Sequence, residues 1–214
     1  MTLKFYMTPG SCSTGIHILL EELEVPFEVT ILNMPAGDHR QPCYLVINPK
    51  GTIPALMLDD GSVLTEFQAI AFWLARAYPR KALLPEDPLK AATVMENMDY
   101  VVGTIHAQGY TRIFTTDNYL PPGLPETERE RWAKAIETRG QEIVEQGFKL
   151  LEPRLPLEGF IAGPRITIAD AALFYVSFWA DHVGIHLPER VAAHYQRMRA
   201  RPMVRQVLME EGYR

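Results

Sequence analysis

The stretch that most constrains this fold runs from residue 48 to residue 71 and reads NPKGTIPALMLDDGSVLTEFQAIA. Residues 55–58 form a short apolar run of strand length. The Asp-Gly pair at residues 60–61 then favours a tight hairpin turn with a positive φ. Residues 62–64 return as the partner strand, and Thr65 opens a helix. The sequence therefore predicts a β-hairpin that leads directly into a helix.

Two positions in this stretch point to ligand binding. Ile53-Pro54 lies where a strand should begin, and proline cannot donate a ladder hydrogen bond. A cis peptide bond there would turn the N–H and C=O of Ile53 outward, free to pair with an extended peptide. The helix start at residues 65–67 offers unpaired backbone N–H groups, which suit a carboxylate. The alternative is an ordinary hairpin with a trans proline.

The elements around this stretch form a recognisable order. Residues 2–7 alternate as a strand, the apolar residues of 13–24 recur at helical spacing, and residues 27–32 alternate again. Together with the hairpin and its helix, they predict a thioredoxin-like βαβ-ββα domain. Residues 35–46 are rich in loop formers, and we expect a short, mobile helix there that starts at Pro42.

The rest of the chain shows no strand pattern. It predicts an all-α domain at residues 89–214, after a thioredoxin-like domain at 1–78 and a linker at 79–88. Thr167 and Asp170 form a capping-box pattern before an apolar helix, with Asp in place of the usual Glu. The other helices are expected at residues 89–116 (with Gly103 and Gly109 as weak points), 126–151, 188–200 and 202–210.

Several motifs together resemble one family. The run N-P-K-G-x-I-P-A-L, then D-D-G, then L-T-E-x-x-A-I, resembles the glutathione-binding half of cytosolic glutathione transferases. Phe5-Tyr6 followed by Pro9-Gly-Ser-Cys-Ser13 most resembles the bacterial beta class, which carries a cysteine there. The resemblance covers essentially the whole chain. It implies the glutathione transferase fold, an acceptor-substrate pocket in the all-α domain, and a homodimer.

Cys12 is the leading catalytic candidate. It lies between a strand end and a helix start, where a helix N-terminus lowers the pKa of a thiol. The hydroxyls of Ser11 and Ser13 would act in the same direction, whereas burial under the loop would oppose them. We expect a thiol pKa below the ordinary value and a mixed disulfide with oxidised glutathione. Gly15 replaces any resolving cysteine, so the site is predicted to be monothiol; a structural Cys12 is the alternative.

The resemblance also places His106 on the long helix, facing the thiol. An imidazole that titrates near neutrality would take the thiol proton or stabilise the thiolate; an ordinary surface histidine is the alternative. Tyr6 and Ser11 are the hydroxyl alternatives to Cys12, since other classes of this superfamily use a tyrosine or a serine.

The glutathione contacts implied by the resemblance are Thr52, Ile53, Pro54, Glu66, Phe67 and Asp99. Glu66 would accept from the γ-glutamyl ammonium. Asp99 stands where the beta class tends to have Asn, and it would reach the glutathione of the neighbouring subunit. Phe67 departs from the family pattern of Ser, Thr or Gly, because it keeps the backbone N–H but has no hydroxyl.

The acceptor pocket is expected to include Met7, Thr8, Tyr110, Arg112 and Phe114. Aromatic residues at helical spacing are also typical of a core, which is the alternative for this group.

Composition excludes several functions. The net charge is −5 and no basic run could follow a phosphate backbone, so nucleic acid is not expected as a partner. No stretch resembles a signal peptide or membrane span, and two cysteines make a disulfide framework implausible. A cytoplasmic protein is expected. The histidines other than His106 show no metal-ligand spacing, and no metal is predicted.

The function predicted from these observations is transfer of glutathione to electrophilic small molecules. Glutathione-dependent thiol–disulfide exchange through Cys12 and a non-catalytic ligand-binding protein of the same fold are the alternatives.

Overall fold

Within residues 2–213, the part of the chain that the computed structural model describes, the strands form one four-stranded sheet in the order β2-β1-β3-β4. The strands are β1 (Leu3–Met7), β2 (Phe27–Ile31), β3 (Ala55–Met57) and β4 (Val63–Thr65). β1 runs parallel to β2 and antiparallel to β3, and β3 pairs with β4 in the predicted hairpin. Gly61 closes that hairpin with a φ of 83°, which glycine adopts without strain.

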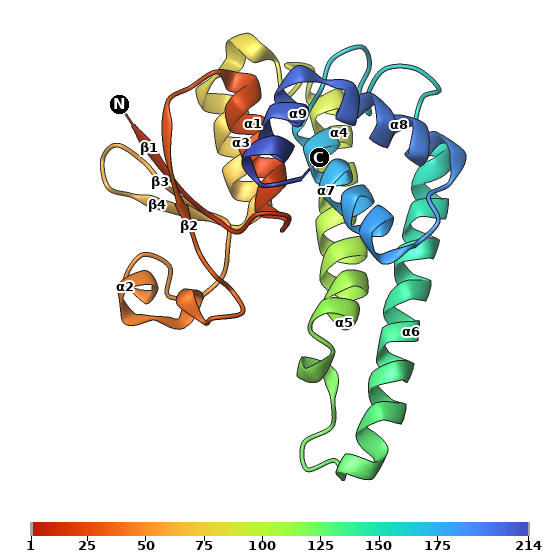
Figure 1. The fold of residues 1–214 in the computed structure, drawn as a ribbon. Helices are drawn as coiled ribbons and strands as arrows, with labels where there is room; N and C mark the ends of the chain where they lie inside the picture. The colour runs from red at the N-terminus through yellow and green to blue at the C-terminus, as the bar shows by residue number, and fades with distance from the viewer. Residues whose placement is uncertain (1, 214) are drawn as a thin grey trace.

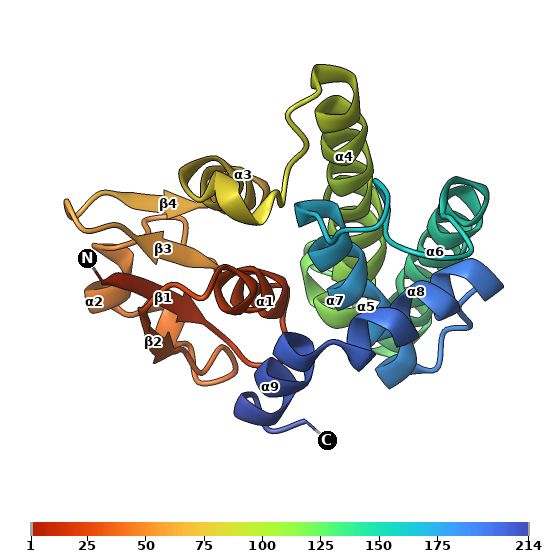
Figure 2. The ribbon, with the colours of Figure 1, turned by 90° about the horizontal axis from the view of Figure 1, so that it is seen from above.

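Helices cover both faces of this sheet. α1 (Ser13–Leu23) and α3 (Phe67–Ala77) lie on the face toward the helical half of the molecule, and α2 (Pro42–Leu45) lies on the other (Figures 1 and 2). α1 buries Ile16, Leu19 and Leu20 completely, as their helical spacing predicts. This is the predicted thioredoxin-like domain, with Pro42 at the first position of its short helix.

The strand pleat divides β1 between two cores. Phe5 and Met7 belong to the large core shared with α1. Tyr6 points to the opposite face and packs with Tyr44 of α2, their rings 5.8 Å apart. Successive strand residues alternate in this way because the side-chain period is two.

The helical half begins with a long helical run. α4 (Pro88–Tyr100) continues through a π-helical stretch, Val101–Tyr110, into α5 (Thr111–Phe114). The predicted helix over 89–116 is therefore continuous to Phe114, but its turns widen where Gly103 and Gly109 lie. A Cβ on Gly109 would lie 2.6 Å from a methyl group of Val144, so this glycine permits close packing of the next long helix.

The remaining helices complete an all-α half. They are α6 (Glu126–Leu151), α7 (Ile168–Val183), α8 (Glu189–Ala200) and α9 (Pro202–Glu210), with 3₁₀ turns at Asp38–Arg40, Pro79–Lys81, Thr116–Tyr119 and Glu152–Arg154. α6 runs beside the long helical run, and α9 returns to pack against α1 (Figures 1 and 2). Within residues 2–213, no helix is both long enough and apolar enough to cross a bilayer.

α7 is the buried centre of this half, and its start confirms the predicted capping box. The Asp170 carboxylate accepts from the Thr167 backbone N–H at 2.7 Å and from the Thr167 hydroxyl at 2.7 Å. Its other oxygen accepts from the Ile161 N–H at 2.9 Å and lies 2.8 Å from His194 Nε2. Asp170 and His194 are fully buried, so this network satisfies a carboxylate that water does not reach.

Candidate active site

A cleft of about 530 Å³ lies between the sheet domain and the helical half. Among the residues predicted from the sequence, it is lined by Ser11, Cys12, Thr52, Ile53, Pro54, Glu66, Phe67, His106 and Phe114. The cleft therefore brings together residues from five separate segments of the chain.

The Ile53-Pro54 bond is cis, which confirms the prediction. The segment before it is held by two contacts to the Thr52 carbonyl, from the Tyr44 hydroxyl at 2.6 Å and from the Asn48 amide at 2.7 Å. Within residues 2–213, no backbone or side-chain atom accepts a hydrogen bond from the Ile53 N–H. A donor at the wall of the cleft thus remains available to a ligand.

The start of α3 forms the polar end of the cleft. Glu66, the residue before the helix, has a φ of 73°, a conformation that non-glycine residues seldom adopt and that is concentrated at functional sites. Its carboxylate pairs with Lys50 Nζ at 2.6 Å, and Lys50 also donates to the Thr65 hydroxyl at 2.9 Å. A carboxylate, an ammonium and a helix N-terminus therefore lie side by side.

Phe67 keeps its backbone at this helix start but buries its ring. The ring packs against Tyr175, with centroids 5.2 Å apart, and is only 3% exposed. A Cβ on Gly15 would lie 2.7 Å from Phe67 Cε2. The Phe67 ring therefore occupies space that the absent side chain of Gly15 leaves open.

Cys12 lies at the N-cap of α1, as expected, but its pKa departs in the opposite direction from the prediction. Burial raises the pKa of the thiol to about 12. The backbone N–H groups of Cys12 and Ser13 lower it, as a helix N-terminus should, and the nearby charge of Glu66 raises it further. The expectation of a lowered pKa was wrong because removal from water outweighs the helix terminus. The protonated Sγ donates to the Ile53 carbonyl at 3.7 Å.

The hydroxyls of Ser11 and Ser13 bond to the loop and not to the thiol. Each donates to the Thr8 carbonyl, at 2.6 and 3.0 Å, and they lie 2.5 Å from each other. Ser13 Oγ also accepts from the Thr8 N–H at 3.1 Å. The expectation that these two hydroxyls stabilise a Cys12 thiolate is therefore wrong.

The loop that carries Cys12 is held at Gly10 from both sides. The Gly10 N–H donates to Glu211, near the C-terminal end, at 2.8 Å. The Gly10 carbonyl accepts from the indole of Trp179, on α7, at 2.7 Å. Both contacts come from the helical half of the molecule.

His106 lines the cleft from the π-helical stretch, but its pKa also differs from the prediction. Burial lowers the pKa of the imidazole to about 4, so the ring is neutral at pH 7. Nδ1 lies 3.1 Å from the Tyr175 hydroxyl, and the ring meets Trp179 edge-on at 4.9 Å. A neutral imidazole with so low a pKa is a weak base, so the expected titration near neutrality was wrong.

Two predicted aromatic residues lie in cores. Tyr6 belongs to the small core on the far face of the sheet, which removes its hydroxyl from the cleft. Tyr110 is fully buried and donates to the Val176 carbonyl at 2.7 Å, and its ring stacks on Phe114. The core alternative therefore describes Tyr110, whereas Phe114 is half exposed and lines the cleft.

The remaining predicted residues also lie outside the cleft lining. Met7 is buried under α1, and the Thr8 hydroxyl donates to the Leu32 carbonyl at 2.8 Å. Asp99 is exposed on α4. Arg112 lies over the ring of Tyr119, 4.6 Å from its centroid.

Sequence reasoning missed part of the lining. The additional residues are Met34, Lys50, Gln68, Val102, Thr111, Thr115 and Trp179. Trp179, together with Tyr175 behind His106, lies in an apolar helix whose residues are nearly all buried. Their spacing of four residues puts them on one helix face, a signal that was present but could not be separated from the core pattern.

Known proteins match this chain along its length. The glutathione S-transferase N-terminal domain model matches residues 10–77, and the C-terminal domain model matches residues 126–197. Glutathione S-transferase GstA of Escherichia coli O157:H7 is 35% identical, over 98% of this chain and 99% of the relative. Glutathione S-transferase GST-4.5 of Xanthomonas campestris pv. campestris is 30% identical over 98% of this chain and 99% of its own.

Solved structures agree with these relatives. A glutathione transferase homologue from Sulfitobacter, with bound glutathione, has a TM-score of 0.86 at 27% identity over 98% of both chains. The bacterial beta-class glutathione S-transferase of Sphingomonas chungbukensis has a TM-score of 0.79 at 29% identity, also over 98% of both chains. With a thioredoxin-like sheet domain, a helical half and relatives along its whole length, the chain belongs to the glutathione S-transferase family and is similar to its bacterial beta class.

Proposed function

We propose that this protein is a glutathione transferase that joins the thiol of glutathione to electrophilic small molecules. One observation carries the proposal: the cleft assembles the cis Ile53-Pro54 edge, the start of α3, Cys12 and His106 around one volume of about 530 Å³. That volume lies within the range typical of small-molecule sites.

The polar end of the cleft fits the charges of glutathione. The Ile53 backbone pairs with the cysteinyl unit, as an added strand would. The γ-glutamyl carboxylate accepts from the Phe67 N–H at the start of α3, and the ammonium pairs with Glu66. Lys50, now paired with Glu66, provides the positive charge for a ligand carboxylate. The site needs no hydroxyl at residue 67, since the buried Phe67 ring leaves the N–H in place.

The raised pKa of Cys12 favours conjugation over redox chemistry. At neutral pH the thiol is protonated, so it can donate a hydrogen bond to the sulfur of bound glutathione. Such a donor stabilises the glutathione thiolate as its proton passes to water. The thiolate then attacks the electrophile, a C–S bond forms and the leaving group departs. His106 assists as a neutral dipole.

The acceptor side of the cleft is mainly apolar. Phe114, Trp179 and Val102 provide apolar surface, and the hydroxyls of Thr111 and Thr115 lie among them. This composition suits an aromatic or alkyl electrophile that carries a polar leaving group.

Oligomeric state, location and domain limits are part of the same proposal. Asp99 is exposed on α4, so in a homodimer it is available to the glutathione site of the second copy. Two unpaired cysteines, Cys12 and Cys43, suit a reducing cytoplasm, where such an enzyme detoxifies electrophiles. The proposed limits are 1–78 for the sheet domain, 79–88 for the linker and 89–214 for the helical domain.

Thiol–disulfide exchange remains the second candidate, because Cys12 lines the cleft. It needs a Cys12 thiolate, which burial disfavours. It would also leave a mixed disulfide between Cys12 and glutathione, because Gly15 stands where a resolving cysteine would be needed. A non-catalytic binder of the same fold is the third candidate.

Three variants separate these functions. Calorimetric titration with glutathione and a conjugation assay with chlorodinitrobenzene are applied to wild type, Cys12→Ser, Cys12→Ala and the control Cys43→Ala. We expect Cys12→Ser to keep most activity because it keeps a donor, and Cys12→Ala to lose about tenfold in kcat/KM, the value of one hydrogen bond. Loss of activity in Cys12→Ser, with deglutathionylation in wild type, would favour the redox function. Glutathione binding without turnover would favour the binder, and no glutathione binding would refute both enzyme functions.

A further inference from the structure

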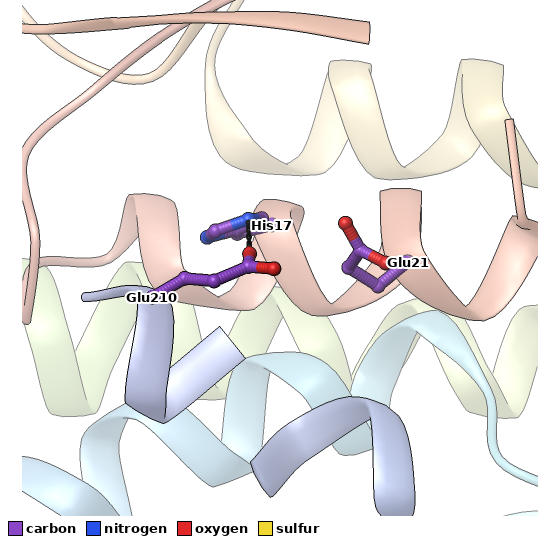
Figure 3. Close-up of side chains that lie close together, drawn as sticks. All are labelled: His17, Glu21 and Glu210. Carbon is purple, nitrogen blue, oxygen red and sulfur yellow. Dashed lines mark ion pairs between the residues drawn. The ribbon is translucent and has the colours of Figure 1, made fainter. Parts of the chain in front are cut away.

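A second pocket, of about 470 Å³, lies between α1, α9 and β2 and shares no lining residue with the cleft. Val29 and Ile31 of β2 form part of its apolar wall and are exposed. His17, Glu21 and Glu210 also line it, where α9 packs on α1 (Figure 3).

These three side chains converge. His17 and Glu21 are four residues apart on α1 and so share a helix face. Glu210 reaches them from α9, and its Oε2 lies 3.2 Å from His17 Nε2 (Figure 3). One ligand atom from each residue lies within 4.8 Å of the others. The sequence showed no such grouping because α9 is at the far end of the chain.

The imidazole is fixed by a residue outside this group. His17 Nδ1 lies 2.9 Å from Glu211 Oε1, and the His17 side chain is 5% exposed. The other Glu211 oxygen accepts from the Gly10 N–H at 2.8 Å and from the Thr14 hydroxyl at 2.6 Å. A carboxylate that accepts from Nδ1–H holds the ring with Nε2 directed at the group, which is the usual outer-shell arrangement of a metal-binding histidine.

The two carboxylates are oriented by a neutral amide. Gln206 Nε2 donates to Glu21 Oε2 at 3.1 Å and to Glu210 Oε1 at 2.9 Å. One oxygen of each carboxylate therefore remains for another partner. Gln206 holds the two like charges together without neutralising either.

The lysine and arginine side chains nearest to this group pair with other carboxylates. Glu22 on α1 and Glu24, the residue that caps its C-terminal end, pair with Arg201 and Lys81, each at 2.7 Å. Among the described residues, no lysine or arginine forms an ion pair with Glu21 or Glu210. A nitrogen ligand and two oriented carboxylates with no lysine or arginine partner are the complement of a divalent cation.

We propose that His17 Nε2, Glu21 and Glu210 bind a divalent transition metal of the Zn²⁺ type. Imidazole selects such metals over Mg²⁺ and Ca²⁺, which prefer oxygen ligands alone. Tetrahedral coordination needs the ligand atoms about 3.4 Å apart, at bond lengths of about 2.1 Å. Glu21 is partly exposed and Glu210 is exposed, so rotation of these two side chains closes the site onto the fixed imidazole.

An ion here would join the first helix to the last. It would also act on the loop that carries Cys12, because Glu211 contacts both His17 and Gly10. The site is separate from the glutathione cleft and does not depend on the proposed function.

The probe is Zn²⁺ alone, titrated calorimetrically into the 214-residue protein in a Cys12→Ser/Cys43→Ala background, which removes the cysteine sulfurs as metal ligands. Glu210→Gln tests the site with an exposed residue, and His17→Gln removes the nitrogen ligand. Glu28→Gln is the matched control, since it removes one exposed carboxylate from β2 that pairs with Lys4 and lies outside the group. Circular dichroism checks the fold of each variant.

We expect one equivalent of Zn²⁺ to bind the parent and Glu28→Gln equally, and Glu210→Gln to bind at least tenfold more weakly. Zn²⁺ should raise the Tm of the parent and not that of Glu210→Gln, because binding to the folded state alone stabilises it. The proposal would be overturned if the parent bound no Zn²⁺ or if Glu210→Gln bound Zn²⁺ as tightly as the parent. It would also be overturned if Glu28→Gln lost as much affinity as Glu210→Gln. His17→Gln should not bind Zn²⁺ if circular dichroism shows that this variant folds. If it does not fold, the comparison of the parent with Glu210→Gln decides whether the site exists.

Discussion

Gly15→Ala tests the packing of the buried Phe67 ring against α1. The added Cβ would lie 2.7 Å from Phe67 Cε2 and 2.9 Å from the Ala171 carbonyl oxygen. The Phe67 ring is confined by Tyr175, and the carbonyl belongs to the backbone of α7, so neither atom moves away cheaply.

The magnitude follows from two opposing effects. Alanine is favoured over glycine inside a helix by about 1 kcal/mol. Overpacking of a core costs roughly 1–3 kcal/mol. We therefore expect Gly15→Ala to lower the free energy of unfolding by about 1 kcal/mol, whereas propensity alone would raise it.

Urea denaturation of four proteins provides the assay: wild type, Gly15→Ala, Phe67→Leu and the double variant. The smaller side chain relieves the clash, so the double variant should be more stable than additivity predicts, by roughly 1 kcal/mol. Gly103→Ala is the matched control, because a Cβ there meets nothing within 4 Å, and it should be neutral or stabilising. The steric coupling would be refuted if Gly15→Ala were as stable as wild type. It would also be refuted if the two single-variant changes in unfolding free energy added up to that of the double variant.

The other predictions concern one helix cap, the titration of Cys12 and His106, and the oligomeric state. Thr167→Ala should cost about 1 kcal/mol by removing a buried cap, measured as a lower urea midpoint, and an unchanged midpoint would contradict the role of Thr167. A thiol reagent at pH 8 should modify exposed Cys43 before Cys12, and peptide mass mapping would show a Cys12-first order if its pKa were low. The pKa of His106 lies near 4 in the folded chain and near 6.5 when unfolded, so its contribution to stability is complete above pH 6.5 and is lost as pH falls toward 4. Urea midpoints should therefore fall more between pH 7 and pH 4.5 in wild type than in His106→Gln. Sedimentation at micromolar concentration should show a homodimer, and a monomer would remove the proposed role of Asp99.

Local signals in the sequence were sufficient for the elements and for several special positions. The Asp-Gly turn, the cis bond at Ile53-Pro54 and the cap at Thr167 depend on a few neighbouring residues, and the structure contains all three. The fold follows from the order of these elements, because strand–helix–strand and hairpin units combine in few ways.

The titration behaviour of the site could not be predicted in the same way. The pKa of Cys12 depends on how much water the helical half excludes, and that burial is the sum of contacts from distant segments. His106 is affected in the same way. Tyr6 and Tyr110 were misplaced for a related reason, since a tyrosine hydroxyl in a strand or helix carries no local sign of which face it occupies.

The two contacts at Gly10 have a consequence for how the molecule can be divided. A fragment that ended after α3 would keep the cis Ile53-Pro54 edge and the start of α3, and so the backbone donors for a peptide ligand. It would lose both Trp179 and Glu211, the partners of the Gly10 carbonyl and N–H. The backbone donors proposed for the peptide thus lie in the first third of the chain, whereas the position of the Cys12 thiol is set by contacts from the helical half.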